Sequence, residues 1–201
     1  MRLVSHQSSA FLVFPDSPAY PRVTRALLEE ILSALEAIRR EPVFRGVIIA
    51  SSAQSWATGA DLEQVAQLSA VTGLEFARCG QNAFKVITNF PLPVVAAIRG
   101  FCLGGGLDLA LACHARVASL NASFGHPGAS MGLVTGWGGT QTLPRRIGKA
   151  QALEALLTAE RIPATQALTI NLVDELVPDR ELWDAAARYA DKLSADLQRR
   201  L

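Results

Sequence analysis

Hydrophobic positions follow two periodicities along the chain, and their order predicts that strands and helices alternate. Residues 11–14 form a short apolar run that predicts a strand, paired in a hairpin with residues 2–4. Between residues 22 and 40 apolar side chains recur at helical spacing, and residues 46–50 follow as a strand buried on both faces. Strand, helix and strand in this order make a crossover unit, which predicts a parallel sheet and the α/β fold class.

The same alternation continues to the end of the chain. A helix is predicted over residues 74–87, followed by strands at 94–98 and 115–119 and a glycine-rich loop at 124–139. From residue 140 the pattern is helical, with breaks at Gly148 and Pro163 and a short extended link at 172–178. Residues 183–201 complete the chain as an amphipathic helix.

Three consecutive glycines stand where residues 93–117 change from a strand into a buried helix. Gly104, Gly105 and Gly106 leave the first N–H groups of that helix open to a bound group, and the helix dipole favours negative charge there. Asp108 follows one turn later on the face of Gly105 and is a potential acid or base. The alternative is a tight packing turn with an acidic residue that complements the dipole.

A second loop offers a similar feature. Residues 51–62 bend at Gly59 and lead into a helix near Asp61, so the backbone N–H of Ala60 is a candidate free donor. The alternative is an ordinary loop in which Asp61 caps the helix.

Composition limits the classes of protein that fit. A chain of 201 residues with 50% hydrophobic residues can bury one core, which favours a single domain. Its 19 basic and 18 acidic residues are interspersed, which argues against a nucleic-acid or membrane partner. Three cysteines without ligand spacing, and the lack of a long apolar segment, predict a reduced cytoplasmic protein without a metal site.

Four phrases in order carry a more specific signal: SWATGADL, PVVAAIRGFCLGGGLDLALACHARVAS, FGHPGASMGLVTGWGGTQTLPRRIGKA and the segment QALEALLTAERIPATQALTINLVDELVP after it. Together they resemble the crotonase, or enoyl-CoA hydratase/isomerase, superfamily. The resemblance implies a ββα spiral core over about residues 1–145, with a helical part over about 146–201 that lacks the usual last helices. It also implies a homotrimer or dimer of trimers, and a coenzyme A thioester as the substrate with no separate cofactor.

The resemblance assigns roles to particular residues. The backbone N–H groups of Ala60 and Gly105 would hold the thioester oxygen and stabilise an enolate. The substrate-binding positions that it implies are Ala57, Gly59, Asp61, Leu62, Gly104 and Trp137. Trp137 stands where the family often has a small residue, so either it limits the acyl pocket or it packs in the core.

Two glutamates activate water in the hydratases of this family. Asp108 matches the first and keeps its charge, whereas Gly128 stands at the place of the second in FGHPG. His126 is a candidate second base if its ring turns inward, but a lone loop histidine is more often a surface or packing residue. Two functions follow: an acyl-CoA enzyme that uses Asp108 as its acid/base, or a crotonase-fold binding or assembly protein without turnover.

Overall fold

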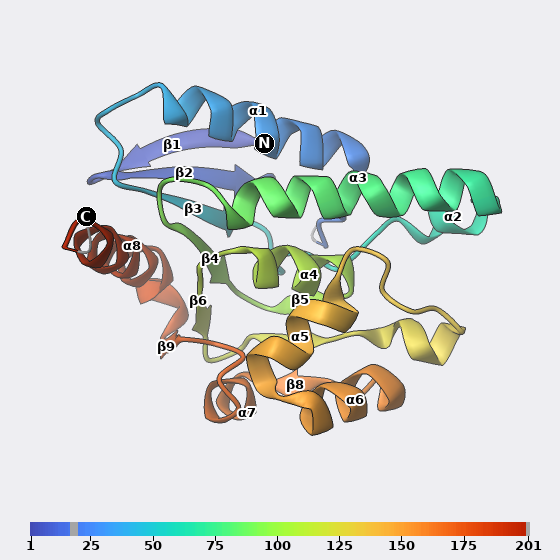
Figure 1. Cartoon of the computed structure of the whole chain (residues 1–201). Coiled ribbons are helices and arrows are strands. Elements are labelled where there is room, and N and C mark those ends of the chain that lie inside the picture. Colours follow the sequence, from blue (N-terminus) through green and yellow to red (C-terminus); the bar gives the residue numbers. More distant parts are fainter. Residues whose placement is uncertain (17–19, 200–201) are drawn as a thin grey trace.

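A six-stranded sheet forms the centre of the protein, in the order β1-β2-β3-β4-β6-β9. The structure is a computed structural model that describes residues 1–16 and 20–199 (Figure 1). Its strands are Arg2–His6 (β1), Ser9–Phe14 (β2), Gly46–Ser51 (β3), Val94–Ile98 (β4), Ala115–Ser119 (β6) and Glu175–Val177 (β9). β1 and β2 pair antiparallel as the predicted hairpin, and the remaining neighbours pair parallel. The sequence-based prediction of a parallel α/β sheet is confirmed.

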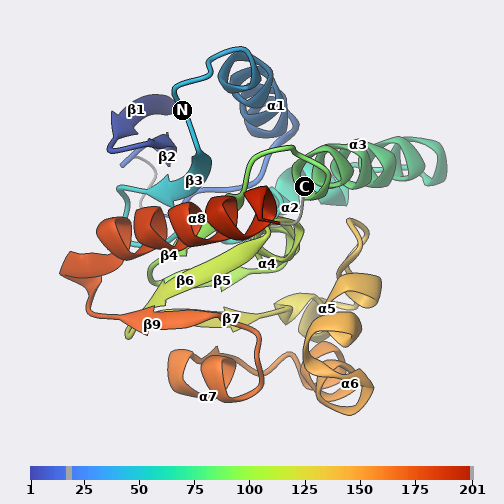
Figure 2. The ribbon, with the colours of Figure 1, turned by 60° about the vertical axis from the view of Figure 1, so that its left-hand side comes forward.

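Alternating side chains of the sheet build a separate core on each face. Phe11 and Val13 of β2 face the helix Leu182–Gln198 (α8), which packs across β3, β4 and β6 (Figure 2). Leu12 and Phe14 face the opposite way, toward the helices Arg25–Arg39 (α1), Ala70–Thr88 (α3) and Gly105–Ala112 (α4). The sheet is therefore covered on both faces, as a parallel sheet requires.

A second, smaller sheet corrects one prediction. Its strands are Phe101–Leu103 (β5), Ser123–Gly125 (β7) and Ile162–Pro163 (β8). The chain does not pass directly from β4 into the buried helix, because Gly100 turns it first with φ +54°. A Cβ atom at Gly100 would lie 2.2 Å from the backbone oxygen of Gln54, so this close turn requires glycine.

Capping residues decide where the two long helices begin. Thr24 accepts a hydrogen bond from the N–H of Leu27, so α1 begins at Arg25 rather than at residue 22. Ser69 and Thr72 form a capping box, so α3 begins four residues before the predicted start at residue 74. The other helices are Leu62–Ala66 (α2), Gly139–Ile147 (α5), Lys149–Thr158 (α6) and Ala164–Thr169 (α7), with 3-10 turns at Pro127–Met131 (η1) and Asp179–Glu181 (η2).

The C-terminal part of the chain is less purely helical than its sequence pattern predicts. It contains α6, α7 and α8, but it also supplies β8 to the small sheet and β9 to an edge of the main sheet. Residues 200 and 201 of the predicted last helix lie outside the described residues. None of the described helices is long and apolar enough to cross a membrane.

Candidate active site

Two chain segments meet at the beginning of α4. Ala57 forms an isolated parallel bridge with Cys102, since its N–H donates to the Phe101 oxygen and its own oxygen accepts from Leu103 at 2.9 Å. This pairing brings Gly59, with φ +97°, against Gly104 and Gly105. A Cβ atom on Gly59 would lie 3.4 Å from the Gly105 nitrogen, so the two glycine segments are in direct contact.

The N–H groups of Ala60 and Gly105 are both without a hydrogen-bond acceptor among the described residues. Gly105 is the first residue of α4, where backbone N–H groups have no partner inside the helix. Both residues lie in the wall of one cavity. The two predicted donors thus come from separate segments and belong to residues that line the same space.

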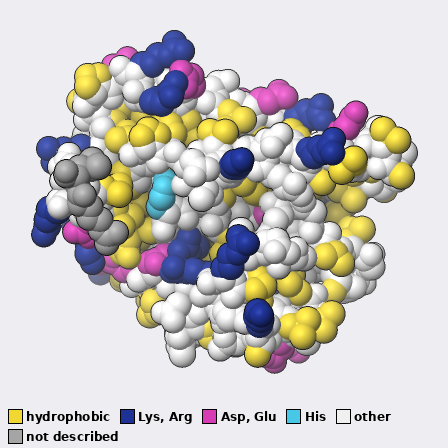
Figure 3. Space-filling model, viewed as in Figure 1, with side chains coloured by type: hydrophobic (Ala, Val, Ile, Leu, Met, Phe, Trp, Pro, Cys, Tyr) yellow, Lys and Arg dark blue, Asp and Glu magenta, His cyan; other side chains and the backbone are white. Residues whose placement is uncertain are grey.

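That cavity has a volume of about 420 Å³. Apolar side chains from α2, α3, η1, α6 and the loops after α2 and η1 form much of its wall, namely Leu62, Val65, Leu68, Phe76, Ala77, Met131, Leu133, Val134, Leu156 and Leu157. Apolar surface continues outward, because Val134 and Leu157 are 78% and 69% exposed. Figure 3 shows hydrophobic side chains on either side of this region, over the tip of α3 and over α6. The cavity suits an apolar chain with a polar group at its inner end.

Asp108 lies in the wall of this cavity, one turn into α4, and its side chain is almost entirely buried. The Thr135 hydroxyl donates a hydrogen bond to Oδ2 of the carboxyl group. Burial raises the pKa of Asp108 to about 7, although the hydrogen bond from Thr135 opposes that rise. A carboxyl group with this pKa can take up and release a proton near neutral pH.

His126 turns inward and does not lie at the surface, which leaves a packing or an acid/base role. Its side chain is 5% exposed, and its Nε2 atom lies 3.4 Å from Oδ1 of Asp108. Burial lowers the pKa of the His126 imidazole to about 4, so the ring is neutral at pH 7. His126 and Asp108 therefore face each other in the cavity wall as two titratable groups.

Gly128 also lies in the cavity wall, but it has no side chain to transfer a proton. A Cβ atom there would lie 2.9 Å from the backbone oxygen of Leu133, whose N–H donates to the oxygen of Gly128. A carboxylate at this position would require the loop around residue 133 to shift.

The predicted substrate-binding positions divide into two groups. Gly59, Leu62, Gly104 and Trp137 belong to the cavity wall, whereas Ala57 and Asp61 do not. Ala57 is fully buried and pairs with β5, and Asp61 caps α2 by accepting from the Glu63 N–H at 3.0 Å. For Asp61 the geometry agrees with the alternative interpretation as a helix cap.

Trp137 lies in the cavity wall and also packs in the core. Its ring lies in the cavity wall, is 5% exposed, and packs against Phe76 with ring centroids 4.9 Å apart. Its Nε1–H donates to the Phe76 oxygen at 3.1 Å. Cβ atoms on Gly80 and Gly105 would lie 2.3 Å and 2.4 Å from the indole, so glycine at both positions makes room for the ring.

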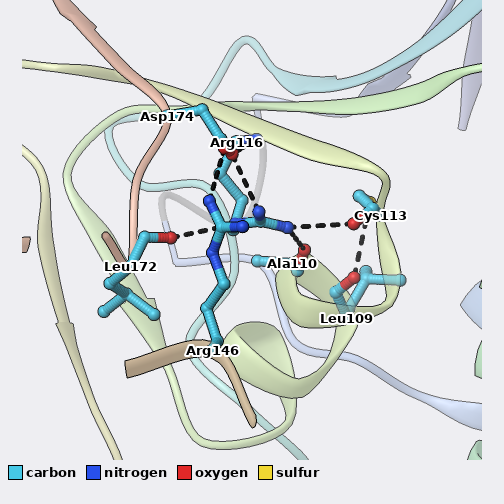
Figure 4. A network of polar contacts seen from close by, with 7 residues as sticks. All are labelled: Leu109, Ala110, Cys113, Arg116, Arg146, Leu172 and Asp174. Carbon is cyan, nitrogen blue, oxygen red and sulfur yellow. Dashed lines mark hydrogen bonds and ion pairs between the residues drawn. The ribbon is translucent and has the colours of Figure 1, made fainter. Parts of the chain in front are cut away.

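An ionic network fixes the other end of α4 (Figure 4). The guanidinium of Arg116 donates to the oxygens of Cys113 at 2.9 Å and Ala110 at 3.4 Å, at the C-terminal end of the helix. A positive charge stabilises this end of a helix dipole. Nε of Arg116 also donates to the Leu172 oxygen, so the network ties α4 to the segment before β9.

Sequence reasoning missed Thr135, the hydrogen-bond donor to Asp108. It stands 27 residues away in the glycine-rich loop, and no spacing or motif marks it. His114 has a structural role, since its Nδ1 accepts from the Val94 N–H at 2.9 Å. The described residues contain no group of three or more His, Cys, Asp or Glu side chains that could hold a metal ion.

Comparisons with known proteins agree with the four phrases of the sequence. The family model described as enoyl-CoA hydratase/isomerase matches residues 16–200. A crotonyl-CoA hydratase of Syntrophomonas wolfei is 36% identical over 192 residues, which cover 95% of this chain and 74% of the relative.

Solved structures show the same fold. DspI of Pseudomonas aeruginosa is 31% identical with a TM-score of 0.89, over 96% of this chain and 80% of that one. An enoyl-CoA hydratase of Bacillus anthracis is 31% identical with a TM-score of 0.88, over 96% of this chain and 76% of that one. The resemblance and the fold predicted from the sequence are confirmed: the chain belongs to the enoyl-CoA hydratase/isomerase family, within the crotonase superfamily.

Proposed function

We propose that the protein is an enzyme that binds an acyl-CoA thioester, stabilises its enolate and transfers a proton at the α-carbon through Asp108. The observation that carries this proposal is the buried carboxyl group of Asp108, with a pKa of about 7, in the same cavity wall as two unpaired backbone N–H groups. Unpaired donors and a titratable group in one concave site are the parts that acid/base chemistry needs.

The backbone donors supply the electrostatic part of the reaction. The N–H groups of Ala60 and Gly105 hydrogen-bond to the thioester oxygen, where negative charge develops as the α-carbon loses or gains a proton. Loss of one such donor costs about 10²- to 10³-fold in rate. Asp108 supplies the proton transfer, because both of its protonation states are populated near pH 7.

The apolar wall of the cavity supports an acyl chain as the part of the substrate beyond the thioester. The matched relative is named a crotonyl-CoA hydratase, which favours a 2-enoyl thioester and the addition of water. Isomerisation of an enoyl thioester uses the same oxyanion and the same carboxyl group.

A binding or assembly protein without turnover is the second candidate function. It is favoured by Gly128, which gives the site one carboxylate instead of two and has little room for a side chain. The two functions differ in whether a bound thioester is converted.

The test is a panel of acyl-CoA thioesters, beginning with crotonyl-CoA, in which binding and product are both measured. We expect conversion by the wild-type protein, a loss of about 10²-fold or more in Asp108→Asn, and no loss in the control Asp184→Asn, whose residue lies exposed beside His6. Binding without conversion would favour the second function. Light scattering on the same preparation tests the expected homotrimer or dimer of trimers.

A further inference from the structure

Two polar atoms in the cavity wall lack the partners that buried polar atoms normally have. Oδ1 of Asp108 and Nε2 of His126 are both shielded from water and have no hydrogen-bond partner among the described residues. A buried polar atom without a partner destabilises the folded state. The two atoms lie 3.4 Å apart, so a single proton between them would satisfy both.

The surroundings determine which oxygen of Asp108 carries that proton. Oδ2 accepts the hydrogen bond from Thr135, which leaves Oδ1 as the oxygen that faces the imidazole. Gly139 leaves room for the pair, because a Cβ atom there would lie 2.2 Å from Oδ1 and 3.0 Å from Cε1 of His126. A proton shared by the pair would thus lie between Oδ1 and Nε2.

Few other titratable groups face the pair. Within the described wall of the cavity the titratable side chains are Arg22, Asp108 and His126, and Arg22 lies exposed. Cys102 is fully buried near Asp108, and burial raises the pKa of its thiol well above the usual value, so it is uncharged. The histidine is therefore the group in this wall that can complement the aspartate in acid/base chemistry.

Building on the proposed function, we propose that His126 is the second acid/base residue of the site, in place of the carboxylate that Gly128 does not supply. The reaction is the addition of water to a 2-enoyl thioester. Asp108 donates the proton at Oδ1 to the α-carbon, and Nε2 of His126, freed of that proton, accepts one from the attacking water.

Atoms and electrons balance in this scheme. The water oxygen forms a bond to the β-carbon, and the C=C electron pair passes through the enolate into the new bond between the α-carbon and hydrogen. The two residues are left as an aspartate and an imidazolium, an ion pair across the 3.4 Å between Oδ1 and Nε2. Return of the proton from Nε2 to Oδ1 restores the starting state, with one water added to the substrate.

The experiment compares two reactions that need different numbers of acid/base groups. Hydration of crotonyl-CoA needs both residues, whereas exchange of the α-protons of butyryl-CoA in D₂O needs the oxyanion donors and Asp108. We expect His126→Gln to lower hydration by about 10²-fold or more and exchange by less than about tenfold. Asp108→Asn should lower both, and His6→Gln, a change at an exposed histidine of β1, should alter neither.

A second substitution, His126→Asn, protects the test against misfolding, and thermal unfolding of each variant shows whether it is folded. Hydration by a folded His126 variant within about threefold of the wild-type rate would overturn the proposal. An equal fall in hydration and exchange would also overturn it, because His126 would then act only through Asp108. A wild-type protein that catalyses neither reaction overturns the proposed function itself, and this inference with it.

Discussion

Asp174 holds Arg116 at two points, with Oδ2 2.8 Å from the backbone nitrogen of Arg116 and 2.8 Å from its Nη2 atom. The Arg116 side chain paired with this carboxylate is 3% exposed, and its guanidinium reaches the C-terminal end of α4 (Figure 4). Arg146 of α5 donates to the other carboxylate oxygen. One carboxylate thus pairs with two arginines and joins α4, α5, β6 and the segment before β9.

Asp174→Ala is therefore expected to lower the free energy of unfolding by about 3–5 kcal/mol, because it leaves a buried guanidinium without its counter-charge. Denaturant unfolding measures the loss. The control is Glu36→Ala, which breaks exposed pairs with Arg39 and Arg40 on α1 and should leave stability unchanged. Equal effects of the two substitutions would show that the Arg116 network does not stabilise the fold.

The pH dependence of stability should separate Asp108 from His126. The folded state raises the pKa of Asp108 to about 7, so from about pH 4 to pH 7 it binds a proton that the unfolded chain has released, and stability falls as the pH rises. The folded state lowers the pKa of His126 to about 4, so from about pH 4 to 6.5 the unfolded chain binds the extra proton and stability rises with pH.

The two contributions oppose each other in the wild-type protein and appear singly in the variants. Between about pH 4 and 6.5, stability should rise with pH more steeply in Asp108→Asn than in the wild type. In His126→Gln the slope should instead be more negative than in the wild type. Urea unfolding at a series of pH values gives the slopes. Parallel curves for all three proteins would contradict the shifted pKa values.

The sequence predicts the regular elements well where a periodic pattern is long or where side chains are apolar on both faces. The α1 helix and strand β3 are the clearest cases, and both lie within three residues of their predicted bounds. Strand β5 was missed because its three residues have no period of their own and pair with β7, 22 residues further along.

Some residues of the candidate site could likewise be predicted from the sequence, and others could not. Ala60, Gly105 and Asp108 lie in motifs whose spacing could be read directly, and all three belong to the cavity wall. The loop between β7 and α5 packs over α4, and this packing turns His126 inward and brings Thr135 to Asp108. Local sequence does not determine that packing, so neither feature was predicted.

Gly80 of α3 should be required because it leaves room for the ring of Trp137, and not because the helix needs a glycine there. A Cβ atom there would lie 2.3 Å from Cδ1 of Trp137, so Gly80→Ala is expected to lower stability by about 1–3 kcal/mol through overpacking. Gly73→Ala in the same helix is the control. It has nothing within 4 Å of the added atom and should stabilise the protein by about 0.5–1 kcal/mol. In a Trp137→Ala background the cost of Gly80→Ala should disappear.

The ring of Trp137 should also limit the length of the acyl chain. It fills the space between Gly80 and Gly105 at the inner wall of the cavity, beside the proposed oxyanion donor. Trp137→Leu removes much of this volume and keeps an apolar wall, so longer chains should be accepted. We expect the ratio of kcat/KM for 2-octenoyl-CoA to that for crotonyl-CoA to rise about tenfold, equivalent to about 1.4 kcal/mol.

The matched control for chain length is Trp183→Leu, since Trp183 packs against Phe11 on the α8 side of the main sheet, outside the cavity wall. Both variants lose a large aromatic side chain, so a general loss of stability affects both. A change in the ratio that is confined to Trp137→Leu therefore reports the shape of the cavity. An unchanged ratio in that variant, with turnover retained, would show that the acyl chain does not extend toward the indole ring.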